Sequence, residues 1–301
     1  MDAKFNRPKG FGQILDLTFT ISKNKFRDLI MILLIFMGPI YLLQALIQLL
    51  FGTSFFREVG PGNTWYEQIL SGFDVGEVTE ATNLGADIGV GFVGFISFFL
   101  FPIATAAILL VVNHMRKNED YTVGSVIKEA FARYWPIIGS TILYSLIVFG
   151  LIFIPIIIIT LVGVFGALAL PALGIVLAIV LFLAFAVGII YLLTRWSFYY
   201  GSVILGEGSP GFSRSWRLTQ KRTWTLIGLY IVFLLIITSI STAIEFTFSL
   251  FLGNSVLYQM IVNIATIFTT LILSVGYAVM YFDLKIRHDA EDLKEMIEDY
   301  K

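Results

Sequence analysis

The sequence contains no cysteine, and charged residues make up only 14% of its 301 residues. Without cysteine, disulfides, thiolate metal sites and cysteine nucleophiles are all excluded. An ordinary soluble domain carries about 25% charged residues. This chain is instead 57% hydrophobic, which is typical of a membrane protein.

Catalytic and cofactor signatures are absent or out of context. No G-x-S-x-G, P-loop or H-E-x-x-H pattern occurs, and His114 and His288 have no spaced partner that would complete a metal site. GVGFVG at 89–94 matches the dinucleotide fingerprint, but it opens an apolar run, where glycines favour close helix packing. We therefore expect no enzymatic activity, no cofactor and no metal ion.

Long apolar runs are what the chain has in abundance. About 20 helical residues cross the roughly 30 Å of hydrocarbon in a bilayer, and these runs are long enough to do so. No charged residue lies between Ile137 and Thr194, so only the glycines and Pro171 of GVFGALALPALG indicate where the chain reverses. We predict an all-α integral membrane protein with six transmembrane helices, at 29–51, 88–113, 137–162, 170–195, 225–251 and 256–282.

The distribution of basic residues predicts the orientation, because cytoplasmic loops retain lysine and arginine. The segments on one side of the six-span arrangement hold 19 of the 20 basic residues, at 1–28, 114–136, 195–224 and 283–301. We therefore expect both termini in the cytoplasm. Attraction to anionic lipid explains basic residues at these places, so we expect membrane lipids as partners and no nucleic acid.

The remaining basic residue, Arg57, lies in a loop at 52–87 that also carries six acidic residues. We expect this acidic loop to face outward. It is suited to a cationic peptide, a protein partner or divalent ions, although a simple solvated loop explains the composition as well.

A lone Arg195 follows the fourth apolar run in LLTRWSFYY. We expect it to end the fourth span and to extend into the headgroups, because an arginine at mid-bilayer costs about 2.5–3.5 kcal/mol or more. The aromatic residues around it are typical of the belt at a headgroup boundary.

A threefold pattern precedes the odd-numbered spans. FGQILDLTF from Phe11, VGSVIKEAF from Val123 and FSRSWRLTQ from Phe212 each place one helical face at positions +3, +4, +7 and +8 from the first residue. We expect three amphipathic helices in the cytoplasmic interface, each followed by a hairpin of two spans, unless any segment beside a membrane would look amphipathic. The single transmembrane domain, 1–301, then has three pseudo-repeats and a cytoplasmic helical tail, at about 10–113, 122–205, 209–283 and 284–301.

The stretch RWSFYYGSVILGEGSPGFSRSWRLTQKRTWTLIG and the closing YFDLKIRHDAEDLKEM resemble the glycerophosphoryl diester phosphodiesterase membrane-domain family of bacteria and archaea. The opening RPKGFGQILDLTF fits this family as well. The resemblance implies a stand-alone multi-span module in the plasma membrane of a prokaryote, without the catalytic barrel to which the module is sometimes joined. Residues that match the family pattern are expected to be structural: Arg195, Glu207, Ser215, Trp224, Asp283, Arg287 and Asp292.

The strongest candidate for a polar site within the membrane is Glu245, the only acid that the six-span arrangement places in hydrocarbon. If the last two spans turn at Gly253 and Asn254, Glu245 lies level with Asn263. We expect this pair to face the bundle interior, either as a structural tie or as part of a polar cavity. Other polar residues in the same half of the membrane are Gln44, Gln48, Thr242, Ser249 and Gln259.

Three functions remain open. The first is a non-enzymatic accessory, stress or resistance protein that interacts with lipid or with a membrane partner. The second is a small-solute transporter or channel subunit that uses a polar cavity around Glu245. The third, an enzyme acting on lipid, lacks an acid–base pair. The amphipathic segments and the absence of catalytic signatures favour the first.

Overall fold

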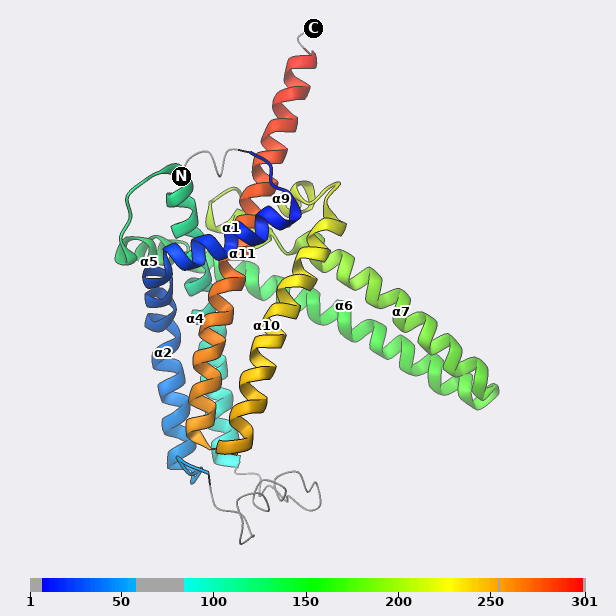
Figure 1. The fold of residues 1–301 in the computed structure, drawn as a ribbon. Coiled ribbons are helices and arrows are strands. Elements are labelled where there is room, and N and C mark those ends of the chain that lie inside the picture. Colours follow the sequence, from blue (N-terminus) through cyan, green and yellow to red (C-terminus); the bar gives the residue numbers. More distant parts are fainter. Residues whose placement is uncertain (1–6, 58–83, 254, 300–301) are drawn as a thin grey trace. The chain divides into compact units, whose positions relative to one another are not determined.

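A computed structural model describes residues 7–57, 84–253 and 255–299, with side chains in the last helix as far as His288. The described residues are helical and contain no strand (Figure 1). In chain order the helices are α1 (Phe11–Asn24), α2 (Phe26–Leu50), α4 (Leu84–Lys117), α5 (Val123–Ala132), α6 (Tyr134–Ala169), α7 (Pro171–Trp196), α8 (Tyr199–Ile204), α9 (Phe212–Leu218), α10 (Thr223–Leu252) and α11 (Val256–Asp299).

Six of the described helices are long and apolar enough to cross a bilayer: α2, α4, α6, α7, α10 and α11. They coincide with the six predicted spans, which confirms the prediction of an all-α membrane protein with six transmembrane helices. At the end of the chain, α11 runs without a break from the sixth span to Asp299, over the segment where a helical tail is expected.

The chain divides into two compact units. Unit 1 consists of Met1–Gln13, Ala130–Ile231 and Ala278–Lys301, and unit 2 consists of Ile14–Glu129 and Val232–Tyr277. The long helices α10 and α11 contribute residues to both units, so the division does not follow the three predicted pseudo-repeats.

A shorter helix precedes α2, α6 and α10, in the order that the threefold pattern predicts. The faces of these helices differ from the prediction, which placed them in the headgroup boundary. Positions +3 and +7 of every copy are at most 1% exposed, and they are occupied by Ile14 and Thr18, Val126 and Ala130, and Ser215 and Thr219. The large aromatic residue at +8 in the first two copies, and at +4 in the third, is exposed. One side of each short helix therefore packs against protein, and only the aromatic side is left for lipid.

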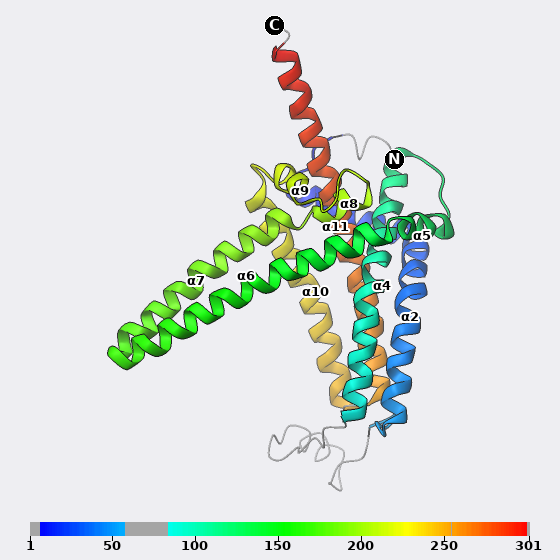
Figure 2. The same ribbon diagram turned by 180° about the vertical axis from the view of Figure 1, so that it is seen from behind.

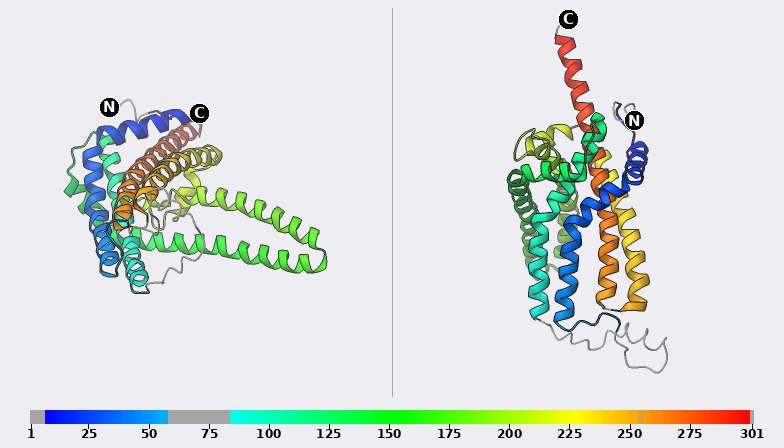
Figure 3. Two further views of the ribbon diagram at one scale, coloured as in Figure 1. Left: turned by 60° about the horizontal axis from the view of Figure 1, so that its bottom comes forward. Right: turned by 90° about the vertical axis from the view of Figure 1, so that its left-hand side faces the viewer.

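In unit 2, α2 and α4 pack against each other, beside the parts of α10 and α11 that belong to this unit (Figure 3, right). Glycines allow the close approach of α2 and α4. A Cβ atom on Gly89 would lie 2.6 Å from Ile47 Cγ2, and one on Gly85 would lie 2.2 Å from Phe51 Cε1. Of the three glycines in GVGFVG, Gly89 has this packing role, whereas Gly91 and Gly94 have open space beside them.

The segment after α2 is tied to the turn between α10 and α11 within the same unit. The backbone amides of Val256 and Leu257 donate to the carbonyls of Ser54 and Phe55, at 3.1 Å each. Arg57 donates from Nη1 to the carbonyl of Leu250 at 2.7 Å. A cation at the C-terminal end of a helix is favourable because the last carbonyl groups carry partial negative charge. Arg57, the basic residue of the acidic loop, therefore caps α10.

In unit 1, α6 and α7 form an antiparallel hairpin with only Leu170 between them (Figures 1 and 2). The reversal falls within the predicted stretch, with Pro171 as the first residue of α7. In the most apolar stretch of each helix only 6% of residues are buried, against 56% in α4. The side chains of this hairpin therefore depend on lipid for their apolar surroundings.

The α6–α7 turn requires glycine at two facing positions. A Cβ atom on Gly174 would lie 2.2 Å from the backbone nitrogen of Ala167, and one on Gly166 would lie 2.8 Å from Gly174 Cα. We expect Gly174→Ala to lower the stability of the detergent-solubilised protein by about 1–3 kcal/mol, because the backbone must shift to admit the methyl group. Thermal unfolding measures the change. Gly188→Ala in the same helix is the control, because nothing lies within 4 Å of the added atom. Equal unfolding temperatures for the two variants would contradict the close approach.

Candidate functional site

The predicted polar site in the membrane is only partly assembled in unit 2. Asn263 is buried, donates from Nδ2 to Gln44 Oε1 at 3.4 Å, and accepts from Gln259 Nε2 at 3.3 Å. The expected pair between Asn263 and Glu245 does not form. Glu245 is exposed, and its carboxylate has no hydrogen bond or ion pair with any described residue. The amide group of Asn263 is already bonded to two glutamines, which leaves Glu245 outside this cluster.

The other members of the predicted site do not gather around Glu245 either. Thr242 is exposed, and the hydroxyl of Ser249 donates to the carbonyl of Phe246 on its own helix at 3.1 Å. Across the residues that the structure describes, no three His, Asp or Glu side chains lie close enough together to hold a metal ion. The strongest polar contacts are instead found in unit 1, beyond the ends of the apolar helices.

Arg195 ends the apolar part of α7, as predicted, but it does not extend into the headgroups. It is only 6% exposed, and its Nη2 donates to the carbonyl of Trp216 at 3.1 Å. Its guanidinium carbon lies 4.0 Å from the centre of the Trp216 ring, in a cation–π contact. The expectation of a headgroup position is wrong because α9 packs onto the end of α7 and covers the arginine.

Ser215 holds α9 in this position. Its hydroxyl donates to the carbonyl of Arg195 at 2.7 Å and accepts from the backbone amide of Phe198 at 3.0 Å. Thr219, one turn further, donates to the same carbonyl at 3.3 Å. The buried hydroxyls of the third amphipathic copy therefore satisfy the free backbone groups where α7 ends.

Glu207 collects donors from two other parts of unit 1. Its carboxylate accepts from the hydroxyl of Tyr281 at 2.9 Å, from Lys285 Nζ, and from Arg214 Nε at 3.4 Å. Tyr281 is fully buried on α11, beside Gly201 of α8, where a Cβ atom would lie 2.5 Å from the ring. Glu207 thus ties the loop between α8 and α9 to α11.

The ionisation of Glu207 is favoured by these partners. Burial alone would raise the pKa of its carboxyl group, but hydrogen bonds from Lys285 and Tyr281 and the positive charges of Lys285 and Arg214 outweigh this effect. The net result is a pKa below the ordinary value for glutamate. The carboxylate therefore stabilises the folded state only while it is charged.

Asp283 forms a second buried acceptor on α11. It is 2% exposed, and it accepts from the backbone amide of Lys9 at 2.6 Å and from Arg287 Nε at 2.9 Å. Arg287 also donates from Nη2 to the carbonyl of Lys9 at 2.6 Å. The N-terminal segment is thereby fixed to α11 by both backbone groups of Lys9. The i,i+4 spacing of Asp283 and Arg287 in the sequence indicates this pair.

Three cations surround this one carboxylate, and we call Lys9, Arg222 and Arg287 the basic cluster. Burial lowers the pKa of the Lys9 amine. The negative charge of Asp283 opposes this shift, and the positive charge of Arg287 adds to it. Burial also lowers the pKa of Arg222. The positive charge of Arg287 lowers this pKa further, and the negative charge of Asp283 raises it by a smaller amount. The guanidinium of Arg222 makes no hydrogen bond or ion pair with another described residue. Among the described residues, Asp283 is thus the carboxylate that acts on each of these three cations.

A family model described as a domain of unknown function, DUF7847, matches residues 29–283, which is most of the chain. The chain belongs to the DUF7847 family. No curated protein and no solved structure matches it. Within this DUF7847 chain, the matched region contains Arg195, Glu207, Arg222 and Asp283, whereas Lys9 and Arg287 lie outside it.

Trp224 and Asp292, which were also expected to be structural, are not among the residues of these contacts that the structure describes. Trp224 is 69% exposed at the start of α10. Asp292 lies in the part of α11 where side chains are outside the described residues. The acidic loop falls mainly on residues 58–83, which are also outside the described residues, so the choice between a solvated loop and a site for a cationic peptide, a protein partner or divalent ions stays open.

Sequence reasoning missed Lys9, Arg222, Tyr281 and Lys285 as site residues of the DUF7847 chain. Lys9 and Arg222 were counted as ordinary basic residues beside spans. The one available signal is that each lies close before an apolar helix, in RPKGFG and QKRTW. Nothing in a single sequence indicates that residues more than 200 positions apart meet at Asp283.

Glu207→Gln tests the first carboxylate. The variant keeps the shape of the side chain but loses its charge, so we expect a loss of about 1–3 kcal/mol of stability near neutral pH. Because the pKa of Glu207 is lowered in the folded state, its contribution is present above the unfolded value of about 4.3 and is lost as pH falls through the folded value. The difference from the wild type should therefore close on acidification. Asp16→Asn, at an exposed site, is the control. A gap that does not change with pH would refute the assignment.

Arg195→Lys tests the cation–π contact. Lysine retains the charge but lacks the planar guanidinium that covers the Trp216 ring and donates to its carbonyl, so the unfolding temperature should fall, with a cost of about 1–2 kcal/mol. Arg217→Lys provides the matched control on exposed α9 surface. If both substitutions leave the unfolding temperature unchanged, Arg195 does not hold α9.

Proposed function

We propose that this protein is a non-enzymatic multi-pass membrane module that binds the phosphate headgroups of anionic lipids through its basic cluster. The observation that carries the proposal is the charge imbalance in unit 1. Arg287 acts electrostatically on both Lys9 and Arg222, and among the described residues Asp283 is the carboxylate that acts on all three cations.

Like charges held close together in a partly buried place repel one another, and their repulsion costs free energy. An anion that enters such a place removes this cost and is bound by the same charges. Arginine is well suited to the task, because its planar group donates two parallel hydrogen bonds to phosphate oxygens. The guanidinium of Arg222 retains its donors for such a ligand, since no described side chain accepts from it.

The position of Arg222 agrees with a lipid headgroup as the source of the phosphate. It directly precedes α10, which begins at Thr223, and the exposed Trp224 follows in the first turn. Exposed tryptophan is typical of the boundary between hydrocarbon and headgroups. Basic residues at that level gain about 1 kcal/mol each from an anionic membrane surface.

The same distribution of charge supports a location in the plasma membrane of a prokaryote, with both termini in the cytoplasm. We retain the resemblance to the glycerophosphoryl diester phosphodiesterase membrane-domain family as part of this proposal, together with an accessory, stress or resistance role. A transporter or channel is less well supported, because its central residue, Glu245, is exposed and lies apart from Asn263 and Gln44.

The experiment compares lipids that differ in charge. Detergent-solubilised protein is titrated with short-chain phosphatidylglycerol, with phosphatidylcholine of the same chain length, and with inorganic phosphate, and thermal unfolding is followed. We expect phosphatidylglycerol to stabilise the wild type more than phosphatidylcholine does, and Arg222→Gln to weaken the phosphatidylglycerol effect about five- to tenfold. Stabilisation by inorganic phosphate alone would assign the site to a soluble anion instead of a lipid.

Arg217→Gln is the matched control, because it removes one charge from exposed surface on α9. It should leave the titration within about twofold of the wild type, since it does not contact the basic cluster. Equal weakening by Arg217→Gln and Arg222→Gln would mean that only diffuse surface charge attracts lipid. No preference for the anionic lipid in the wild type would end the proposal.

A further inference from the structure

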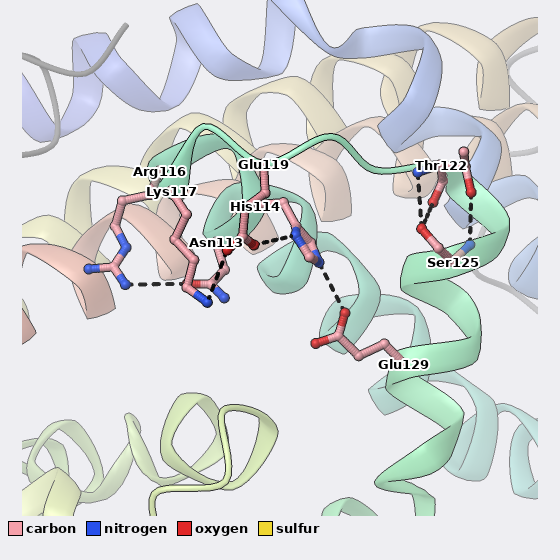
Figure 4. A network of polar contacts seen from close by, with 8 residues as sticks. All are labelled: Asn113, His114, Arg116, Lys117, Glu119, Thr122, Ser125 and Glu129. Carbon is pink, nitrogen blue, oxygen red and sulfur yellow. Dashed lines mark hydrogen bonds and ion pairs between the residues drawn. The ribbon is translucent and has the colours of Figure 1, made fainter.

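A separate polar network closes the turn between α4 and α5 in unit 2. It lies within residues 113–129 and is drawn in Figure 4. His114, in the last turn of α4, is its centre, with one carboxylate on each side of the imidazole ring (Figure 4). Nδ1 lies 2.9 Å from Glu119 Oε2, and Nε2 lies 3.0 Å from Glu129 Oε2.

The two contacts require a particular protonation state. An ionised carboxylate can only accept hydrogen bonds, and a neutral imidazole carries a single N–H group. Both bonds of His114 can therefore exist together only when both ring nitrogens are protonated, which gives the ring a positive charge. A neutral ring would place a lone pair against one of the two carboxylates and lose that contact.

The two carboxylates are not held equally well. Glu119 follows His114 by five residues in a tight turn, where its backbone amide donates to the carbonyl of His114 at 3.0 Å. Its side chain is also 3.6 Å from Lys117 Nζ. Glu129, 15 residues from His114, has the His114 ring as its partner among the described side chains. Loss of the ring's charge therefore leaves Glu129 without an ion pair to a described side chain, whereas Glu119 keeps the one to Lys117.

The first turn of α5 is fixed independently of His114. Thr122 and Ser125 exchange hydrogen bonds between backbone amide and side chain, at 3.0 and 3.1 Å, and so cap the start of the helix (Figure 4). Tyr121 donates to Asp28 of α2 at 2.9 Å, and Lys25 lies over its ring. Loss of the Glu129 ion pair therefore loosens the second half of α5, where Ala130 remains buried, while the beginning of the helix stays in place.

We propose that His114 is a pH-operated latch, which ties Glu129 of α5 to the end of α4 while the imidazole is charged and loosens this tie when the imidazole is neutral. Histidine is the side chain that changes charge between about pH 5 and pH 8. The latch is closed on the acidic side of this range and opens as pH rises. It acts on one of the short helices that border the apolar spans, and it is independent of the basic cluster.

The other ionisable groups around the ring do not reproduce this behaviour. Burial and the hydrogen bond to Asp28 raise the pKa of Tyr121, which stacks on His114 with ring centres 6.2 Å apart, so that it stays neutral. The charged groups around the ring are Lys25, which lies between α1 and α2, Asp28 from α2, Arg116 and Lys117 from α4, and Glu119 and Glu129.

The absence of cysteine makes the test direct, because two introduced cysteines carry the only labels. Spin labels at Asn24→Cys on α1 and Lys128→Cys on α5, both exposed and both in unit 2, report the position of α5. The full chain is placed in phosphatidylcholine nanodiscs, which contain no anionic lipid. Pulsed electron resonance then gives the distribution of distances between the labels at about pH 5.5 and about pH 8.5.

In the wild type we expect one narrow population on the acidic side and a second, displaced population that grows roughly fivefold at the higher pH. That change corresponds to about 1 kcal/mol, which suits an ion pair with half-exposed glutamates. His114→Asn should show the displaced population at both pH values. Glu129→Gln should lose the pH response, because a glutamine amide bonds to either form of the ring.

His288→Asn, which removes the other histidine of the chain, is the matched control and should respond to pH as the wild type does. A distribution that does not change with pH in the wild type overturns the proposal. A response that survives in His114→Asn assigns it to another group, and a response that survives in Glu129→Gln shows that Glu129 is not the released arm.

Discussion

The exclusion of unsatisfied polar groups from hydrocarbon is the constraint on which this structure depends. Inside a bilayer every backbone group must be bonded within the chain, and a charged side chain is costly. The chain meets this requirement with long uninterrupted helices. One of them, α6, contains no charged residue. Charged side chains are consequently concentrated beyond the helix ends, and the contacts that distinguish one arrangement from another are made there.

Two carboxylates organise the helix ends of unit 1, the half-buried Glu207 and the buried Asp283. Glu207 joins the loop after α8 to α11, and Asp283 joins the N-terminal segment to α11. Each accepts hydrogen bonds from cations or amides that are far away in the sequence, so each closes a long loop of chain. Because the cations around Asp283 outnumber the carboxylates, the same arrangement that holds the fold also leaves positive charge available for an anion.

Hydroxyl groups have a comparable role where helices begin and end. Ser215 and Thr219 bond to the carbonyl of Arg195, and Thr122 and Ser125 cap α5. A side chain that satisfies a free backbone group replaces water at that place. This explains why positions of an apparently amphipathic face carry serine or threonine in the third copy and are nevertheless buried.

The six spans, a reversal within GVFGALALPALG and the order of short and long helices followed from the sequence, because hydrocarbon selects for local properties: length, hydropathy and the absence of charge. The burial of Arg195, the exposure of Glu245 and the meeting of Lys9 with Asp283 did not follow from it. Each depends on which distant segment covers a residue, and a single sequence carries no record of such contacts. The sequence alone thus determined how many helices cross the membrane and where they end, whereas only the tertiary structure decided which charges meet, because the pairing of side chains is set by packing between segments far apart in the chain.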